Sequence, residues 1–289
     1  MHYEGNIIRP PSEANSILLQ VTVGCSHNQC TFCGAYSEKR FKIKSDQIIL
    51  DDIVYAARHF SQHTRLFLCD GDALIIKQDK LLWILTSIRK HLPNINRVGI
   101  YANAKSLQRK SREELVALRE LGLGIVYMGL ESGDAETLKQ VHKKSTPDEQ
   151  IIAGKKVRAA GLKLSITVIL GLASRERSQI HAKATGNALT QIDPNYVGAL
   201  SLMLVPGTVM HQAWESKAFY LLNAMEMLQE LKTMIAYTEL SRGLFFANHA
   251  SNYLPIKARL PKDKKMTLEL IEHAIKGNIM LKPEFLRGL

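Results

Sequence analysis

Three cysteines lie within nine residues of one another, at Cys25, Cys30 and Cys33. They follow the apolar run of residues 17–23, which has the composition of a buried strand. An iron–sulfur cube of four irons normally takes four cysteine thiolates, so three cysteines leave one iron with an open coordination position. A metal site that lacks one protein ligand is suited to catalysis rather than to structure. The segment is therefore a candidate for a reactive iron–sulfur centre.

Zinc is the alternative metal for these cysteines, with His27 as a possible further ligand. Structural zinc sites usually combine two pairs of ligands from separate segments, and the sequence has no second pair. The fourth cysteine, Cys69, stands apart, and we expect it to be a small buried apolar residue. The missing second pair counts against a structural zinc site, and zinc stays the alternative metal at this point.

The composition is that of a globular protein, with 46% apolar and 22% charged residues in a chain of 289. The start of the sequence does not have the pattern of a signal peptide, and no apolar stretch is long enough to cross a bilayer. We therefore expect a cytoplasmic protein without a membrane partner, in a compartment where thiolates stay reduced. The net charge of +11 is compatible with an anionic partner such as RNA, but the basic residues are dispersed.

Apolar runs alternate with amphipathic helical patterns along most of the chain. The predicted strands are residues 17–23, 66–69, 97–101, 125–130, 163–170 and 197–204. The predicted helices between them are residues 46–60, 79–91, 111–121, 147–160 and 179–191. Repeated strand–helix units indicate parallel strands. We predict an α/β fold, a partial (β/α)6 barrel of the TIM type with a mostly helical C-terminal extension; an open parallel sheet is the alternative.

The predicted extension begins at residue 212, which divides the chain into a core domain of residues 1–211 and an extension of residues 212–289. Amphipathic helices are expected at residues 219–233 and 267–276. Between them, residues 248–253 combine several side-chain donors and acceptors. His249 and Asn252 in this segment are candidates for contact with a substrate, and a surface turn is the alternative interpretation.

Polar or glycine-rich turns follow each predicted strand. The three cysteines follow the first strand, Asp70-Gly71-Asp72 the second, Asn103 the third, Glu131-Ser132-Gly133 the fourth, Gly171 the fifth and Pro206-Gly207-Thr208 the sixth. Active sites of parallel α/β folds form at the carboxyl ends of the strands. The sequence therefore predicts that these turns contribute to one site.

These motifs resemble those of the radical S-adenosylmethionine (radical SAM) superfamily, over residues 17–208 or so. The resemblance is closest to the branch with the oxygen-independent coproporphyrinogen oxidases, the tRNA methylthiotransferases and the elongator-type enzymes. It rests on Gly-Cys…Cys-Thr-Phe-Cys ending at Cys33, on the Asp70-Gly71-Asp72 turn, and on Gly129-Leu130-Glu131-Ser132-Gly133. Four residues separate Cys25 from Cys30 where the family usually has three, and Asp70 stands where it often has glycine.

The resemblance implies a [4Fe-4S] cluster and S-adenosylmethionine as cofactors. It implies that Cys25, Cys30 and Cys33 bind the cluster and that the open iron binds the methionine end of S-adenosylmethionine. The cofactor contacts that it implies are Phe32 near the adenine, Asp70, Gly71 and Asp72 at the methionine amino group, Glu131 and Ser132 at the ribose or methionine, and Gly171 beside the adenine.

The same resemblance implies an enzyme that reductively cleaves S-adenosylmethionine to a 5′-deoxyadenosyl radical, which abstracts hydrogen from a substrate. Its partners would be a one-electron reductant of the flavodoxin or ferredoxin type and a substrate that is a small molecule, a peptide or tRNA. The alternative function is a non-catalytic zinc- or iron–sulfur-binding module with affinity for RNA.

Overall fold

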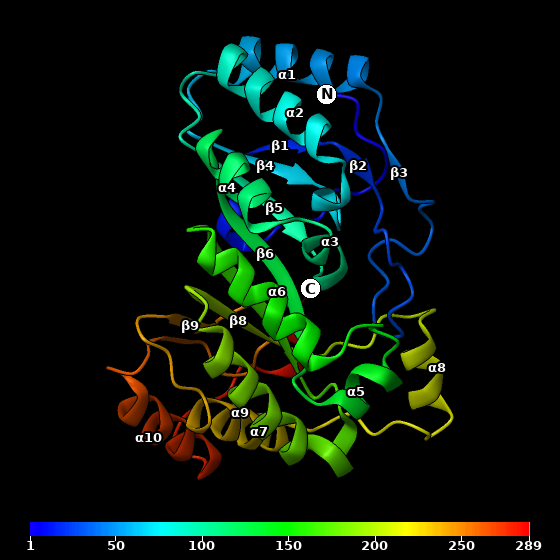
Figure 1. Ribbon diagram of the computed structural model, residues 1–289. Coiled ribbons are helices and arrows are strands. Elements are labelled where there is room, and N and C mark those ends of the chain that lie inside the picture. The colour runs from blue at the N-terminus through cyan, green and yellow to red at the C-terminus, as the bar shows by residue number, and fades with distance from the viewer. Residues whose placement is uncertain (289) are drawn as a thin grey trace. The chain divides into compact units, whose positions relative to one another are not determined.

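The computed structural model describes residues 1–288 and divides into two compact units (Figure 1). The first unit contains residues Met1–Asn28, Ala35–Met128 and Lys156–Leu164. The second contains Gln29–Gly34, Gly129–Lys155 and the chain from Ser165 onward. Each unit therefore draws on segments that are distant in the sequence.

Parallel strands form the centre of the first unit, in the order β1-β4-β5-β6. They are β1 (Ile17–Gln20), β4 (Arg65–Cys69), β5 (Arg97–Ala102) and the part of β6 (Leu123–Glu131) up to Met128. Leu19 lies opposite Leu68, and Leu68 lies opposite Ile100. These strands are almost continuously apolar because both of their faces are buried. The first predicted strand is interrupted, since β2 (Thr22–Val23) pairs antiparallel with β3 (Lys42–Ile43).

Helices α1 (Asp46–His59) and α2 (Gln78–His91) pack side by side in the first unit, and α1 also contacts β1 (Figure 1). The unit also contains α3 (Ala104–Gln108), α4 (Arg112–Glu120) and the 3-10 helices η1 (Pro11–Glu13) and η2 (Ala73–Ile75). The side chains of Asn103 and Ser111 cap α3 and α4 by accepting a backbone N–H of the first turn. The capping box that the sequence predicts from Ser111 to Glu114 is confirmed.

The second unit contains strands in the order β7-β8-β9-β10. They are β7 (Lys163–Leu170), which enters this unit at Ser165, β8 (Tyr196–Ser201), β9 (Leu244–Ala247) and β10 (Ile256–Arg259). Strands β7, β8 and β9 are parallel, and β10 runs antiparallel to β9. In β10 the buried residues alternate with the exposed Lys257 and Arg259.

The helices of the second unit include a packed group of α7 (Ser174–Ile192), α9 (Ala224–Ala236) and α10 (Lys264–Ile275), in which α9 contacts both of the others (Figure 1). The other helices are α5 (Ala135–Gln140), α6 (Pro147–Ala159), which continues into the first unit at Lys156, α8 (Val209–Glu215) and the 3-10 helix η3 (Glu284–Leu286). In residues 1–288, no helix is both long and apolar enough to cross a membrane.

The structure confirms the predicted strands and long helices to within three residues, with three exceptions: the first strand is broken, α7 begins at Ser174 rather than residue 179, and α9 begins at Ala224 rather than residue 219. The sequence did not predict the short helices α3, α5 and α8, or the strands β9 and β10 within the largely helical C-terminal segment. The proposed boundary at residue 212 stays a prediction; the structure places the chain from Ser165 onward in one compact unit.

Candidate active site

The backbone before Cys25 is held by a buried carboxylate at the end of β4. The Oδ2 atom of Asp70 accepts hydrogen bonds from the backbone N–H of Gly24 at 3.2 Å and from Gln20 Nε2 at 2.9 Å. Lys39 Nζ lies 3.4 Å from the same oxygen. Asp70 is fully buried. The Asp70 side chain therefore fixes the backbone just before Cys25 and also binds Lys39, which follows Cys33 in the chain.

A second carboxylate, Asp72, joins three strand ends of the first unit. Its Oδ2 atom accepts hydrogen bonds from Ser26 Oγ at 2.5 Å and from Asn103 Nδ2 at 2.8 Å. Burial raises the pKa of Asp72, because the charged form is costly away from water. The Oδ1 atoms of Asp70 and Asp72 are both buried and have no hydrogen-bond partner among residues 1–288. Two carboxylate oxygens on either side of Gly71 are thus available to a donor such as an ammonium group.

Gly71, between these aspartates, lies where no side chain would fit. A Cβ atom there would come within 2.7 Å of Tyr36 Cε2 and within 3.1 Å of Cys25 Cβ. The backbone N–H of Gly71 donates to the carbonyl of Gly24 at 3.2 Å. The glycine therefore allows the turn after β4 to contact the residue beside Cys25 closely.

The segment with the other two cysteines, Gln29–Gly34, belongs to the second unit. The backbone N–H of Thr31 donates to the carbonyl of Val141 at 3.1 Å, and its carbonyl accepts from the N–H of Met210 at 3.0 Å. The N–H of Cys33 donates to the carbonyl of Cys30 at 3.2 Å. These bonds fix the backbone between the two cysteines, whose side chains are half-buried.

Phe32 is half-buried, and Gly34 lies beside Val205, whose Cγ1 atom would be 2.7 Å from a Cβ at position 34.

The four cysteines form no disulfide. Cys69 is fully buried, as expected, and burial raises the pKa of its thiol, which makes it a poor nucleophile or ligand. No group of three His, Cys, Asp or Glu side chains in residues 1–288 is arranged to hold a metal ion. The thiols of Cys25, Cys30 and Cys33 nevertheless have the donor chemistry that iron–sulfur clusters require.

Glu131 and Ser132 form the turn after β6. Glu131 has a positive φ of 62°, and its Oε1 atom lies 2.8 Å from Lys143 Nζ. The hydroxyl of Ser132 lies 2.7 Å from His181 Nδ1 and accepts the backbone N–H of Asp134 at 2.9 Å. Both predicted cofactor residues thus have protein partners that fix their side chains.

The turn after β7 is held by a carboxylate from α9. The N–H of Gly171, which has a φ of 79°, donates to Glu230 Oε1 at 2.6 Å. Ser178 Oγ donates to the other oxygen at 2.5 Å, and His181 Nε2 lies 3.5 Å from Oε1. Burial raises the pKa of Glu230 to about 7 and lowers that of His181 to about 4. The sequence analysis does not predict a role for Glu230 or His181, because each is an isolated polar residue within a helical segment of the sequence.

The two substrate candidates differ in their surroundings. Asn252 is buried; its Nδ2 donates to the carbonyl of Ala199, and its Oδ1 accepts from Ser201 Oγ, both at 2.9 Å. His249 is half-buried, with Nδ1 2.9 Å from Ser251 Oγ, and burial lowers its pKa. Both ends of the Asn252 amide are thus used within the protein, which leaves His249 as the better placed of the two for an external ligand.

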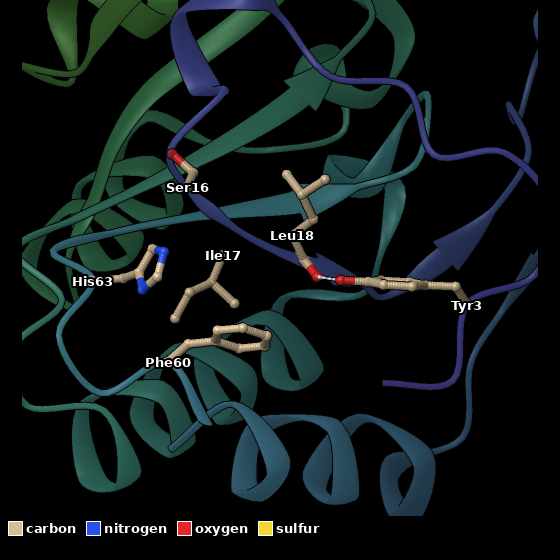
Figure 2. A pocket seen from close by; sticks show the side chains of 6 residues that line it. All are labelled: Tyr3, Ser16, Ile17, Leu18, Phe60 and His63. Carbon is tan, nitrogen blue, oxygen red and sulfur yellow. Dashed lines mark hydrogen bonds between the residues drawn. The ribbon is translucent and has the colours of Figure 1, made fainter. Parts of the chain in front are cut away.

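A separate pocket of about 140 Å³ lies at the start of β1 (Figure 2). Its walls are mostly apolar; they come from the N-terminal segment, β1 and the chain after α1, and include Ile17, Phe60 and His63. The hydroxyl of Tyr3 donates to the carbonyl of Leu18 at its edge. This pocket lies at the amino end of β1 and contains none of the predicted site residues.

The sequence pattern of the radical SAM superfamily matches residues 19–181, more than half of the chain. The chain belongs to the radical SAM superfamily. The matched residues include the three cysteines and the turns after β4, β6 and β7.

Relatives and solved structures of this superfamily share parts of the chain. The 4′-phospho-dehydrooxetanocin synthase of Priestia megaterium is 24% identical over 173 residues, which are 54% of this chain and 23% of that protein. Coproporphyrinogen III oxidase (HemN) of Escherichia coli is 16% identical, with a TM-score of 0.56 over 77% of this chain and 51% of its own. Elp3 of the archaeon Methanocaldococcus infernus is 14% identical, with a TM-score of 0.53 over 91% and 63%.

The chain therefore spans about a quarter of the curated relative and less than two thirds of either solved structure. The structural likeness confirms the predicted fold class, the α/β partial barrel of the TIM type. It also includes two of the enzyme types named in the predicted branch. Radical SAM proteins are enzymes with a [4Fe-4S] cluster and S-adenosylmethionine as cofactors, as the sequence predicts for this chain.

Proposed function

We propose that Cys25, Cys30 and Cys33 hold a [4Fe-4S] cluster in this radical SAM enzyme and leave one iron open for S-adenosylmethionine. When bound, the cluster supplies the electron that splits S-adenosylmethionine into methionine and a 5′-deoxyadenosyl radical, and that radical removes a hydrogen atom from the substrate. The protein contributes position and the exclusion of water. The spacing of the cysteines and their place after the first strands support this assignment.

One observation carries the proposal furthest: the turn beside Cys25 keeps two buried carboxylate oxygens without partners, on Asp70 and Asp72. A buried carboxylate oxygen without a donor is costly, and the methionine ammonium group would supply the missing hydrogen bonds. A structural zinc site has no use for such acceptors. Gly71 lets this turn lie directly against Tyr36 and Cys25, because a Cβ atom there would clash with both.

The remaining cofactor contacts are proposed turn by turn. Phe32, half-buried between Cys30 and Cys33, would pack near the adenine. Glu131 and Ser132 would face the ribose or methionine, and the backbone of Gly171 would border the adenine. The ion pair between Glu131 and Lys143 would fix the glutamate for this role. We propose a flavodoxin or ferredoxin as the electron donor, a cytoplasmic location, and His249 as a contact to the substrate.

The test is anaerobic reconstitution with iron and sulfide, followed by incubation with S-adenosylmethionine and dithionite. We expect roughly four irons per chain and the release of 5′-deoxyadenosine, measured by mass spectrometry. Alanine at Cys25, Cys30 or Cys33 should abolish both. Cys69→Ala is the matched control, because that buried thiol lies outside the proposed ligand set and should leave both unchanged.

The outcome that contradicts the proposal is a fully loaded wild-type protein that releases no 5′-deoxyadenosine. Such a protein would be a non-catalytic metal-binding module. A wild-type protein that binds only zinc, or iron loss in Cys69→Ala equal to that in the three other variants, would also overturn the ligand assignment.

A further inference from the structure

Glu230 is a buried carboxylate that serves two segments of the second unit at once. It lies on α9, and its side chain is inaccessible to solvent. One oxygen accepts the N–H of Gly171, in the turn after β7, at 2.6 Å. The other accepts the hydroxyl of Ser178, in the first part of α7, at 2.5 Å. The carboxylate therefore connects the end of a strand to the helix that follows it.

The contacts continue from Glu230 to a second strand end. His181 lies one turn after Ser178 on α7, with Nε2 3.5 Å from Glu230 Oε1 and without a hydrogen-bond partner among residues 1–288. Its other ring nitrogen, Nδ1, lies 2.7 Å from Ser132 Oγ, and that oxygen accepts the N–H of Asp134. Like Glu230, His181 is fully buried. Hydrogen bonds therefore connect Glu230 to the turn after β7, and His181 Nδ1 lies within hydrogen-bond distance of the turn after β6, with the two side chains 3.5 Å apart.

Packing reinforces the polar contact at Gly171. Met227 lies one turn before Glu230 on α9, and its Sδ atom would be 3.0 Å from a Cβ at Gly171. Gly171 has a φ of 79°, a conformation that side chains disfavour, so its backbone takes a path that few other residues could follow. Two residues of α9 thus define the position of this turn.

A buried carboxylate and a buried imidazole are expensive to keep in a protein core. Burial disfavours the charged form of each, and an apolar pair of similar size is often equally stable or more stable. Stability alone therefore gives little reason for this pair. The groups that the two side chains contact do give a reason, because Ser132 and the backbone of Gly171 are two of the proposed contacts to S-adenosylmethionine.

We infer that Glu230 and His181 are positioning residues for the S-adenosylmethionine site, with Glu230 setting the turn at Gly171 and His181 setting the hydroxyl of Ser132. This inference rests on the proposed function of those two turns. Neither residue needs to touch the cofactor; each fixes a backbone or hydroxyl group that does. Helix α9 lies outside the matched segment of residues 19–181, so this chain would complete its cofactor site with residues beyond that segment.

The test compares Glu230→Leu, Glu230→Gln and His181→Phe in the reconstituted holoprotein. Equilibrium dialysis measures the Kd for S-adenosylmethionine without reduction of the cluster, and iron per chain is measured on the same samples. Glu230→Leu leaves the N–H of Gly171 without an acceptor, so we expect at least about tenfold weaker binding at unchanged iron content. Glu230→Gln keeps an oxygen for Gly171 and should restore the affinity to within about threefold. His181→Phe should weaken binding as well, through Ser132.

Leu231→Ala is the matched control for a loss of stability. Leu231 is the next residue on α9 and is buried, so its truncation should lower the melting temperature while leaving the Kd unchanged. In steady-state cleavage of S-adenosylmethionine, Glu230→Leu should raise KM much more than it lowers kcat.

Two results would overturn the inference. One is a Glu230→Leu protein that binds S-adenosylmethionine as tightly as the wild type. The other is a loss of affinity that follows melting temperature equally in Glu230→Leu and Leu231→Ala. A wild-type holoprotein that carries its full iron but does not bind S-adenosylmethionine would instead contradict the proposed function itself.

Discussion

Replacing Gly71 by alanine would place a methyl group against two residues of the cysteine segment. The new Cβ would lie 2.7 Å from Tyr36 Cε2, 3.1 Å from Tyr36 Cζ and 3.1 Å from Cys25 Cβ. A separation of 2.7 Å is far inside carbon–carbon contact, so an atom must move. Tyr36 is 7% exposed and therefore has little room to swing aside. The backbone at Cys25 is tied through Gly24 to Asp70.

Overpacking of this kind costs roughly 1–3 kcal/mol. For a chain of this size, each kcal/mol corresponds to about 2–4 °C in melting temperature. We therefore expect Gly71→Ala to lower the melting temperature by several degrees. We also expect it to reduce the iron bound after reconstitution, because the relaxation displaces Cys25.

Thermal denaturation monitored by circular dichroism and iron analysis under anoxia are the assays. Gly198→Ala is the matched control, since a Cβ in that strand would have no neighbour closer than 3.9 Å and the melting temperature should stay within about one degree. The double variant Gly71→Ala/Tyr36→Leu should recover part of the loss, with a coupling energy of at least ~0.5 kcal/mol. A Gly71→Ala protein with wild-type melting temperature and iron content would refute the reasoning.

Three further predictions concern polar residues. Asp70→Asn should lower the free energy of unfolding by about 1–3 kcal/mol and weaken iron retention, because it removes the charge opposite Lys39; urea denaturation and iron analysis would show it, and an unchanged unfolding curve would count against the anchoring role. His249→Ala should leave iron per chain and substrate-free release of 5′-deoxyadenosine unchanged; a loss of iron would assign this half-buried residue to the structure instead. In the wild type, burial gives Glu230 a pKa of about 7 against a reference value of 4.5, so its contribution to the free energy of unfolding falls as pH rises between these values. Burial gives His181 a pKa of about 4 against a reference value of 6.5, so its contribution to the free energy of unfolding increases with pH. The two contributions nearly cancel between pH 4.5 and 6.5. Glu230→Gln leaves only the histidine contribution, so its free energy of unfolding should rise by ~3 kcal/mol from pH 4 to 6.5; a flat urea-denaturation profile across this range would contradict the pair.

The elements that the sequence predicts well are those whose pattern is local. Strand β7 is rich in Val, Ile and Leu, and its observed bounds, Lys163–Leu170, are those predicted. Helix α4 was recognised from the Ser111 capping box. The sequence does not predict strand β9, because Leu244–Ala247 is only four residues long and is followed by a polar segment. Its strand conformation depends on pairing with β8, which no local pattern reveals.

The residues of the candidate site also fall into those that the sequence predicts and those that it does not. The cysteines and the acidic turn were identifiable because their spacing is a motif in the sequence. The structural role of Asp70 was not, because its partners Gly24 and Lys39 precede it by more than thirty residues. Glu230 and His181 are further apart still, and only the packing of α9 on α7 brings them to the turns that they hold. Interactions that a fold creates between distant segments are beyond what a residue pattern can show.

Strand β10 ends the strand order of the second unit, and its side chains bear on how the protein behaves at high concentration. An outermost strand offers unpaired backbone groups to any other extended chain. Here Lys257 and Arg259 alternate with buried residues along a strand only four residues long. A second copy that docked its own β10 alongside would bring like charges together, which opposes fibrous self-association. Replacement of both basic residues by threonine would thus be expected to favour precipitation during purification without any change in the cofactor site.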